Sequence, residues 1–359
     1  MSRTIAIQPD TVRHKNGEEQ SFSARWVELA EQIGIQARMV DAFAPDFFQQ
    51  IVGCDGFLWR FGYPKLPRAF AKRLLPAIEH GMGIPVFPDW RTAWHFEDKI
   101  AQSYLLEAAG IPIPRTWVFW RPEDAIAFCH GAAYPLVMKL SYGYQSANVR
   151  LLQRAEEATY WVQQMFGPGI KSVQMPTGAR ANKYVRRFLT AARTLAGRTP
   201  LDNSDSELQQ GYVLFQEFLP GNEFDTRITI IGNRAFGFRR FNRPNDFRAS
   251  GSGHIDWDPK EIDIEAVRLA FDIAQRFQTQ SVAVDVLRRG AEPVIAEISY
   301  TYASWALRDC PGHWMLRGDN PETGELEWVE GQMRPEDAIF EDFIARIRLH
   351  STTAISVAS

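Results

Sequence analysis

SVAVDVL (residues 281–287) and PVIAEIS (residues 293–299) are two apolar segments separated by a short stretch that contains Arg-Gly. Their alternation and the intervening turn residues predict a β-hairpin. The hairpin would bring Asp285 and Glu297 side by side. A carboxylate among so many apolar neighbours is costly to bury without a partner, and Mg²⁺ binds through one or two carboxylates together with phosphate oxygens. The pair therefore indicates a magnesium site, unless arginines on neighbouring strands compensate both acids.

Two lysines indicate a site for phosphate groups. Lys139 lies in YPLVMKL, and a lysine inside such a strand is seldom buried without a partner. Gly143 follows between Tyr142 and Tyr144, in a loop whose backbone N–H groups we expect to close over phosphates; an ordinary loop between strands remains the alternative. Lys99 follows two acidic residues that suit the start of a helix, where a solvated lysine is the plainer interpretation.

Strand and helix patterns alternate through residues 1–95, which predicts a parallel sheet covered on both faces. We expect strands at 4–8, 36–40, 56–60 and 84–87, and helices at 23–33 and 69–80.

The rest of the chain predicts two further units, 96–210 and 211–350, and a flexible tail at 351–359. An insertion at about 168–210 is rich in polar residues and carries the basic segment KYVRR, which could bind a polymeric anion or form a solvated helix face. We expect strands at 117–120, 136–140, 149–152, 212–218, 227–231 and 235–240, and helices at 98–109, 264–277 and 335–349.

The composition excludes several classes of protein. A 45% share of hydrophobic residues and 23% of charged residues is typical of a folded chain, and a net charge of −3 supplies no broad basic field for nucleic acid. The three cysteines are far apart, which argues against a zinc site or disulfide framework. No GxGxxG follows the first strand, which disfavours a Rossmann dehydrogenase. Without a membrane-spanning or signal-type segment, we expect a cytoplasmic protein.

The order of these motifs resembles that of the ATP-grasp carboxylate–amine ligases. The resemblance runs from DKIAQSYLLEAAGIPIP through YPLVMKL and LFQEFLPGNEFDTRITIIGNRAFGFRR to DFRAS and VAVDVL...AEIS, over roughly residues 96–304. It looks closest to the ligases that add glutamate to a ribosomal protein and to glutathione synthetases. It implies an α/β (α+β) ATP-grasp fold, in which an N-terminal parallel-sheet domain precedes two lobes that clamp ATP.

The resemblance also implies a role for each motif. Lysines would contact the α- and β-phosphates, the loop glycine would lie in a lid, a hinge strand would offer backbone groups to adenine, and an acid would lie near the ribose. The residues implied to bind ATP are Lys99, Lys139, Gly143, Gln216, Glu217, Phe218, Leu219 and Glu223.

Arginines and acids complete the implied site. Arg240 and Arg248 would face the γ-phosphate and an acyl phosphate, with Arg227 near the substrate. Mg²⁺ would be held by Asp285, Glu297 and Ser299. A serine stands at position 299 where family members usually have an asparagine, and the lid has few glycines, so the number of metal ions stays open.

The implied reaction activates a carboxylate as an acyl phosphate and joins it to an amine, with release of ADP. The implied partners are small-molecule carboxylate and amine substrates, with a saccharide or polymer as a further candidate, and a homodimer stays open. GFLWRFG and PDWRTAWHFEDK resemble segments of ATP-grasp proteins from cell-surface polysaccharide pathways, which would make the carboxylate a uronic acid. A kinase that phosphorylates a hydroxyl and a nucleotide-binding scaffold without turnover remain alternatives.

Five further residues are candidates for the substrate cleft. Arg60, at the end of an apolar strand, could receive a carboxylate through two hydrogen bonds or pair with a neighbouring Asp. Tyr300, Tyr302 and Trp305 could line the cleft, although we expect at least one of them in the core. His254 follows a Gly-Ser-Gly segment, and we expect it at the surface.

Overall fold

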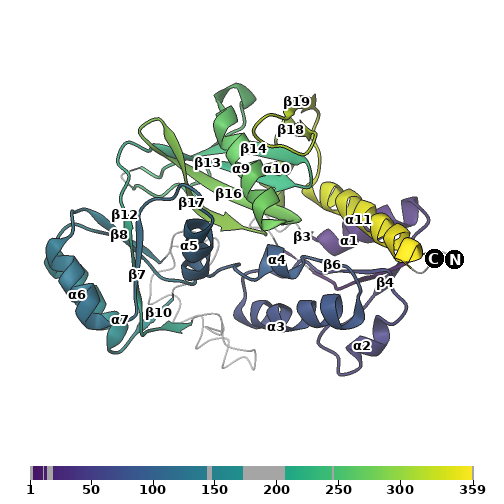
Figure 1. Ribbon diagram of the computed structural model, residues 1–359, viewed down its shortest axis with the longest axis horizontal. Coiled ribbons are helices and arrows are strands. Elements are labelled where there is room, and N and C mark those ends of the chain that lie inside the picture. Colours follow the sequence, from purple (N-terminus) through teal and green to yellow (C-terminus); the bar gives the residue numbers. More distant parts are fainter. Residues whose placement is uncertain are drawn as a thin grey trace, which may run out of the picture.

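The computed structural model describes residues 3–10, 12–13, 19–143, 148–172, 207–244 and 246–357. Three units follow one another along the chain: an N-terminal unit, a unit that we call the small lobe, and a unit that we call the C-terminal lobe (Figure 1). The mixture of parallel and antiparallel sheets with packed helices confirms the predicted α+β fold class.

The N-terminal unit is a parallel sheet with helices on both faces. Its strands run in the order β4-β1-β5-β6, which confirms the four predicted strands. Its elements are β1 (Thr4–Ile7), β2 (Val12–Arg13), β3 (Glu19–Gln20), α1 (Phe22–Gln32), β4 (Gln36–Met39), α2 (Phe47–Gln50), β5 (Gly56–Leu58), α3 (Lys65–Pro76), a π-helical turn (Ala77–Gly81), β6 (Val86–Phe87) and α4 (Trp90–Ala93). The carboxyl ends of parallel strands share one edge of the sheet, so Asp10 and Arg60 meet there.

The small lobe is an antiparallel sheet, β7-β12-β8-β9, with α6 and α7 packed on one face (Figure 1). The sequence analysis missed both of these helices. The elements are α5 (Lys99–Ala108), β7 (Thr116–Phe119), α6 (Pro122–Gly131), β8 (Leu136–Lys139), β9 (Val149–Leu152), α7 (Ala155–Phe166), β10 (Ile170–Lys171), β11 (Leu208–Gln209) and β12 (Val213–Glu217). The KYVRR segment of the expected insertion lies outside the described residues.

The C-terminal lobe is a seven-stranded sheet in the order β17-β16-β13-β14-β18-β19, with β15 beside β14. Both predicted hairpins are confirmed, and β18 and β19 were missed. The elements are β13 (Phe224–Ile231), β14 (Arg234–Phe241), β15 (Ile255–Asp256), a 3₁₀ turn (Pro259–Glu261), α9 (Ile264–Phe277), β16 (Ser281–Arg289), β17 (Glu292–Ser299), α10 (Ser304–Arg308), β18 (Gly312–Arg317), β19 (Glu325–Glu330) and α11 (Pro335–Val357).

Helix α11 joins the C-terminal lobe to the N-terminal unit. It runs back to lie beside α1 (Figure 1), where the Trp26 indole donates to the carbonyl of Glu336 at 3.0 Å. One buried cluster therefore contains Ile5 from β1, Phe236 from β14 and Phe343 from α11. The helix continues to Val357, beyond its predicted end at residue 349. Because they share this core, the first and last units form one platform for the site.

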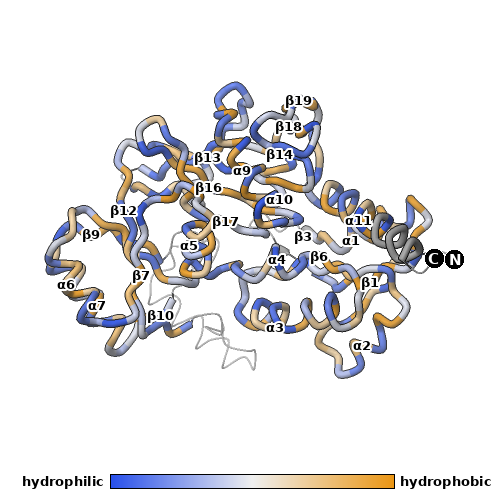
Figure 2. Tube along the Cα trace, viewed as in Figure 1, coloured by the Kyte–Doolittle hydropathy of each residue, from blue (hydrophilic) through white to orange (hydrophobic). Residues whose placement is uncertain are grey.

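Figure 2 shows that hydrophobic and hydrophilic residues are interspersed along the chain in all three units. No helix within the described residues is long and apolar enough to cross a membrane.

Replacing Gly56 by alanine should destabilise the protein, because β5 and α11 approach closely at this glycine. An added Cβ would lie 2.7 Å from the Ile347 side chain and 2.9 Å from the Phe343 ring, and both of those side chains are buried. Overpacking of this kind costs about 1–3 kcal/mol. Gly81→Ala is the control, since a Cβ there would meet nothing within 4 Å. Equal melting temperatures for the two variants would contradict the packing of α11 on β5.

Candidate active site

A pocket lies between the small lobe and the C-terminal lobe, beside α5. Its space is about 340 Å³, counted together with solvent at its mouth. Apolar side chains form much of its wall, and two lysines and one glutamate face into it. The lining residues are Lys99, Gln102, Ser103, Leu106, Ile113, Thr116, Lys139, Leu214, Gln216, Ile295, Ala296 and Glu297. The structure thus brings together three of the residues that the sequence implied for ATP and one, Glu297, that it implied for the metal ion.

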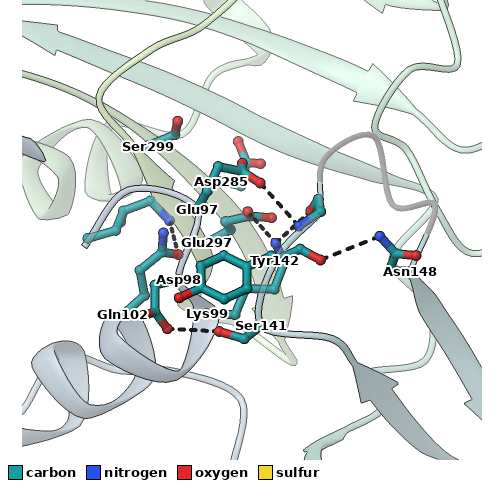
Figure 3. Close-up of polar contacts among 12 residues, drawn as sticks. Glu97, Asp98, Lys99, Gln102, Ser141, Tyr142, Asn148, Asp285, Glu297 and Ser299 are labelled. Atoms are coloured by element: carbon teal, nitrogen blue, oxygen red, sulfur yellow. Dashed lines mark hydrogen bonds and ion pairs between the residues drawn. The ribbon is translucent and has the colours of Figure 1, made fainter. Parts of the chain in front are cut away.

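The first turn of α5 places Lys99. Asp98 is the N-cap: its Oδ1 accepts from the Ala101 amide at 3.1 Å and from the Ser141 hydroxyl at 2.8 Å. The ammonium of Lys99 then donates to the Gly143 carbonyl at 2.9 Å and pairs with Glu297 at 3.0 Å. Burial alone would lower the pKa of Lys99, but Glu297 and Glu97 raise it. Lys99 therefore joins the loop after β8 to strand β17 (Figure 3).

Glu97 is a site residue whose role the sequence analysis missed. Its φ of 55° is rare outside glycine, and it is 4% exposed. Its carboxylate accepts from the Gly143 amide at 3.2 Å, and burial raises its pKa. Glu97 and Lys99 therefore hold the N–H and the C=O of the same glycine. Strained backbone of this kind persists where the surrounding structure imposes it, often at functional sites.

Lys139 is a half-buried cation without a partner among the described residues. Within the described part of the chain, its ammonium makes no hydrogen bond or ion pair, although it lines the same pocket as Glu297. Burial lowers the pKa of Lys139 to about 8; Glu297 opposes that shift and Lys99 adds to it. A phosphate group in the pocket would supply the missing counter-charge.

Asp285 is held by arginines from two neighbouring strands. Arg227 of β13 donates to both of its oxygens, at 2.6 and 2.7 Å. Arg240 of β14 lies 2.8 Å from Asp285 and also binds Asp225 at 2.6 and 2.7 Å. Burial alone would raise the pKa of Asp285, but the two guanidinium groups hold it well below its usual range. The alternative interpretation, in which arginines compensate the charge of the acids, therefore applies to Asp285. The charge of Glu297 is compensated by Lys99 instead.

The acidic pair has one carboxylate oxygen left for a metal ion. Asp285 and Glu297 are directly opposite in the β16–β17 register, and Oε2 of Glu297 has no partner among the described residues. The Ser299 hydroxyl donates to the Thr301 carbonyl at 2.8 Å. No group of three or more His, Cys, Asp or Glu residues in the described ranges could hold a metal ion. The donor set therefore fits a magnesium ion that takes most of its ligands from phosphates and water.

The predicted hinge begins with the last two residues of β12, Gln216 and Glu217. The Gln216 amide donates to the Thr116 hydroxyl at 2.9 Å. Glu217 pairs with Arg289 at 3.0 Å and Arg115 at 3.4 Å, so its carboxylate ties the small lobe to the β16–β17 turn. Burial alone would raise the pKa of Glu217, but its hydrogen bonds with Arg115 and Arg289 lower it.

Backbone donors are available beyond that strand. Phe218 and Leu219 lie in an irregular segment after β12. In the described chain, neither of their N–H groups has a protein acceptor. They remain available to a ligand, as the implied adenine site requires.

Three predicted residues lie away from the acidic pair. Arg248 pairs with Asp246 at 2.7 Å, in the loop after β14, and makes no contact with Asp285 or Glu297 in the described chain. Glu223 is exposed where the hinge enters β13, and His254 is exposed, as expected.

The aromatic residues after β17 pack into the core. Tyr300 and Tyr302 are each 2% exposed. The Tyr300 hydroxyl donates to the carbonyl of Phe61, and the Tyr302 hydroxyl lies 2.7 Å from the Ser281 hydroxyl. Trp305 packs against the cluster around α11. The expectation that at least one of them is a core residue is confirmed.

Contacts from distant segments hold the loop after β8, and no pattern in the sequence predicts them. The Gln209 side chain accepts from the Tyr142 amide at 3.1 Å and donates to its carbonyl at 3.0 Å. The Arg68 guanidinium lies 4.8 Å from the centre of the Tyr142 ring and pairs with Glu207. The lid predicted at 142–144 thus begins as an anchored segment, and Tyr144 lies outside the described residues.

Comparison with solved structures identifies the fold of this chain. No family model matches the sequence, and no curated protein does. The solved structure of ATP-grasp ligase PsnB with a minimal precursor, Mg and ADP is similar over 96% of this chain and 98% of that one, with a TM-score of 0.54 and 14% identity. The chain has an ATP-grasp fold.

Other ATP-grasp structures are similar as well. PsnB with its minimal precursor covers 86% of this chain and 93% of that one, at 16% identity and a TM-score of 0.50. The RimK domain ATP-grasp protein from Sphaerobacter thermophilus DSM 20745 has 19% identity and a TM-score of 0.48, over 86% of this chain and 95% of that one. The fold that the motif order implied is confirmed.

Asp285→Ala should destabilise the protein strongly. The change leaves Arg227 and Arg240 against a single carboxylate, that of Asp225, and removing one partner from a buried charge network costs about 3–5 kcal/mol. Urea unfolding measures the loss. Arg248→Gln is the control, because it removes a more exposed pair that is worth about 0–1 kcal/mol. Similar losses in both variants would contradict the network at Asp285.

Lys139→Met should stabilise the protein at pH 7. The pKa of Lys139 is about 8 in the fold against an ordinary 10.5, so the unfolded chain binds this proton more tightly and the protonated lysine opposes folding. The expected gain is about 1–3 kcal/mol below pH 8, and it shrinks as the pH rises from 8 to 10.5. Unfolding across that range tests this, with exposed Lys260→Met as a flat control. Destabilisation at pH 7 would instead show that Lys139 has a carboxylate partner.

Proposed function

We propose that this protein is an ATP- and Mg²⁺-dependent ligase that activates a carboxylate and couples it to an amine, with release of ADP and phosphate. The observation that carries the proposal is the pocket between the lobes of an ATP-grasp fold, into which Lys99, Lys139 and Glu297 converge. A pocket with apolar walls and unbalanced positive charge suits a nucleotide with its phosphates.

The adenine would lie between the apolar residues of the pocket. Ile113 and Leu214 contribute from the small lobe and Ile295 from the C-terminal lobe. The N–H groups of Phe218 and Leu219 would donate to the base. Specific polar contacts of this kind orient a ligand that apolar walls hold.

The phosphates would lie over the two lysines. Lys139 would gain its counter-charge there, and Lys99 would exchange part of its pairing with Glu297 for a phosphate oxygen. The Gly143 N–H, which Glu97 now accepts, would become a further donor when the loop closes. Closure would exclude water from a reactive acyl phosphate.

A magnesium ion would be held by Glu297, with Asp285 beside it, and would neutralise charge on the phosphates. Transfer of a phosphoryl group depends on positioning and charge neutralisation. Arg240 and Arg227 lie next to the acidic pair and would orient the acyl phosphate for attack by the amine.

The similarity to PsnB bears on the class of reaction and of substrate. PsnB is an ATP-grasp ligase whose structures contain a precursor, Mg and ADP, and this supports a ligase reaction in general. We propose small-molecule substrates from cell-surface polysaccharide or small-peptide synthesis, with uronic acids as the first carboxylates to try. A cytoplasmic location would suit a reaction that consumes ATP.

A second candidate is nucleotide binding without turnover. The arginine partners of Asp285 favour it, since both oxygens of this carboxylate already have guanidinium partners. The serine at position 299 points the same way, because its hydroxyl donates to a backbone carbonyl.

Release of ADP and phosphate from Mg-ATP tests the proposal. We expect release that requires both a carboxylate and an amine, from a panel of uronic acids and other carboxylates crossed with amino acids. Lys139→Met and Glu297→Gln should each reduce the rate about 100-fold or more, because each removes charge from the reacting phosphates. Lys260→Met, an exposed lysine change, should leave the rate unaltered.

The products separate the candidates. An amide with free phosphate supports the ligase, and a stable phosphate ester would show a kinase. Tight binding of Mg-ATP by the wild type without release under any pairing would favour the second candidate.

A further inference from the structure

A second, narrow pocket lies at the carboxyl edge of the N-terminal sheet. Arg60 follows β5 and lines this pocket together with Thr301 and aromatic rings from α1, β6 and the segment after β17. Its space is about 180 Å³, counted with the solvent at its mouth. The crevice beyond the carboxyl ends of parallel strands is where ligands bind in open α/β sheets.

The Arg60 guanidinium is buried with few partners. Its side chain is 10% exposed. One Nη donates to the Tyr302 carbonyl at 3.2 Å, and the group lies 4.5 Å from the centre of the Phe22 ring. Its Nε has no partner among the described residues. A guanidinium carries five N–H donors, so the described residues leave most of its capacity unused.

Asp10 is a poor counter-ion for this arginine. The closest approach of its carboxylate to Arg60 is 3.9 Å. Its oxygens already accept from the Ser23 amide at 2.7 Å and the Ser21 hydroxyl at 3.2 Å, at the start of α1. Because a buried charge without a close counter-charge is costly, the pocket lacks an anion.

The hydroxyl of Thr301, which also lines this pocket, is a second polar group without a partner among the described residues. Thr301 is 2% exposed. Arg60 and Thr301 come from different units of the chain and meet at one pocket. Together they offer a planar pair of charged N–H donors and a hydroxyl, which is the donor set of a carboxylate site.

The pocket adjoins the candidate active site. Thr301 lies four residues after Glu297 on the segment that leaves β17, and its carbonyl accepts from the Tyr63 hydroxyl at 3.4 Å. Burial and the charge of Glu97 raise the pKa of Tyr63 to about 12. The two pockets share no lining residue, so a group held by Arg60 is distinct from the group at Lys139.

We propose that Arg60 and Thr301 form a binding site for a substrate carboxylate that is not itself phosphorylated. This rests on the proposed ligase function, in that the ligand is one of its two substrates. Such a carboxylate comes either from an amino acid whose amine is the acceptor or from a dicarboxylic donor. In both cases the arginine anchors one end of the molecule while the other end reaches the phosphates.

Direct binding to the full chain, without ATP, tests the site. The probes are acetate, glycine and glutarate, compared with chloride at equal ionic strength, and thermal shift and calorimetry are the readouts. We expect at least one probe to stabilise the wild type more than chloride. Stronger binding of glycine than of glutarate identifies an amino-acid source, and the reverse order identifies a dicarboxylate.

Variants locate the binding. Arg60→Gln should weaken the probe at least tenfold, and Arg60→Lys, which keeps the charge but loses the planar pair of donors, should weaken it as well. Arg38→Gln is the matched control on the same sheet and should bind like the wild type. Without a probe, Arg60→Gln should be at least as stable as the wild type, because it removes a buried charge.

Two results would overturn the site. One is the absence of any probe effect on the wild type up to tens of millimolar, and the other is unaltered probe binding by Arg60→Gln. Both are separate from the ligase proposal, because Mg-ATP binding by Arg60→Gln and ADP release by the wild type are measured independently.

Discussion

Charge compensation within the sheet of the C-terminal lobe is the constraint on which the site depends. The β16–β17 hairpin places Asp285 opposite Glu297 among apolar neighbours, and neither carboxylate can stay there without cations. Those cations come from three other elements: β13, β14 and α5. Each ion pair fixes the position of one element relative to the hairpin. The pairs of Asp285 lie within one sheet, whereas the Lys99–Glu297 pair joins α5 to the hairpin and therefore helps to set the width of the pocket between the lobes.

Lys139 has no carboxylate partner among the described residues, and its positive charge makes the pocket attractive to anions. Lys139 shares the pocket with Lys99 and Glu297, yet Glu297 is 3.0 Å from Lys99 alone. An ammonium group that lacks a counter-charge and is partly shielded from water binds an anion more readily than an ammonium in bulk water does. This excess of positive charge is local, since the chain as a whole has a net charge of −3. Attraction for phosphate is thus a property of a few side chains rather than of the overall charge.

Sequence patterns could predict what depends on neighbours along the chain. The alternation around Asp285 and Glu297 predicted both strands and their pairing, and helix α9 has the predicted bounds, because its apolar face and its Asp263 cap are local signals. Helix α6 was missed although Pro122 and two acids mark its start. The partners of Arg227 and the positive φ of Glu97 could not be predicted, since both follow from contacts between segments far apart in sequence. The ATP-grasp motifs gave the list of site residues, but they could not say that Arg248 pairs with Asp246.

The position of α11 has a consequence for how the chain acquires its structure. The N-terminal sheet is synthesised before α11, yet Trp26 and Phe343 belong to one buried cluster. Until residues 335–357 leave the ribosome, one face of the first sheet lacks its cover. Domains that fold one after another during synthesis do so because each contains its own core. Here the first unit must wait for α11, and until then its exposed apolar face must be kept from other chains.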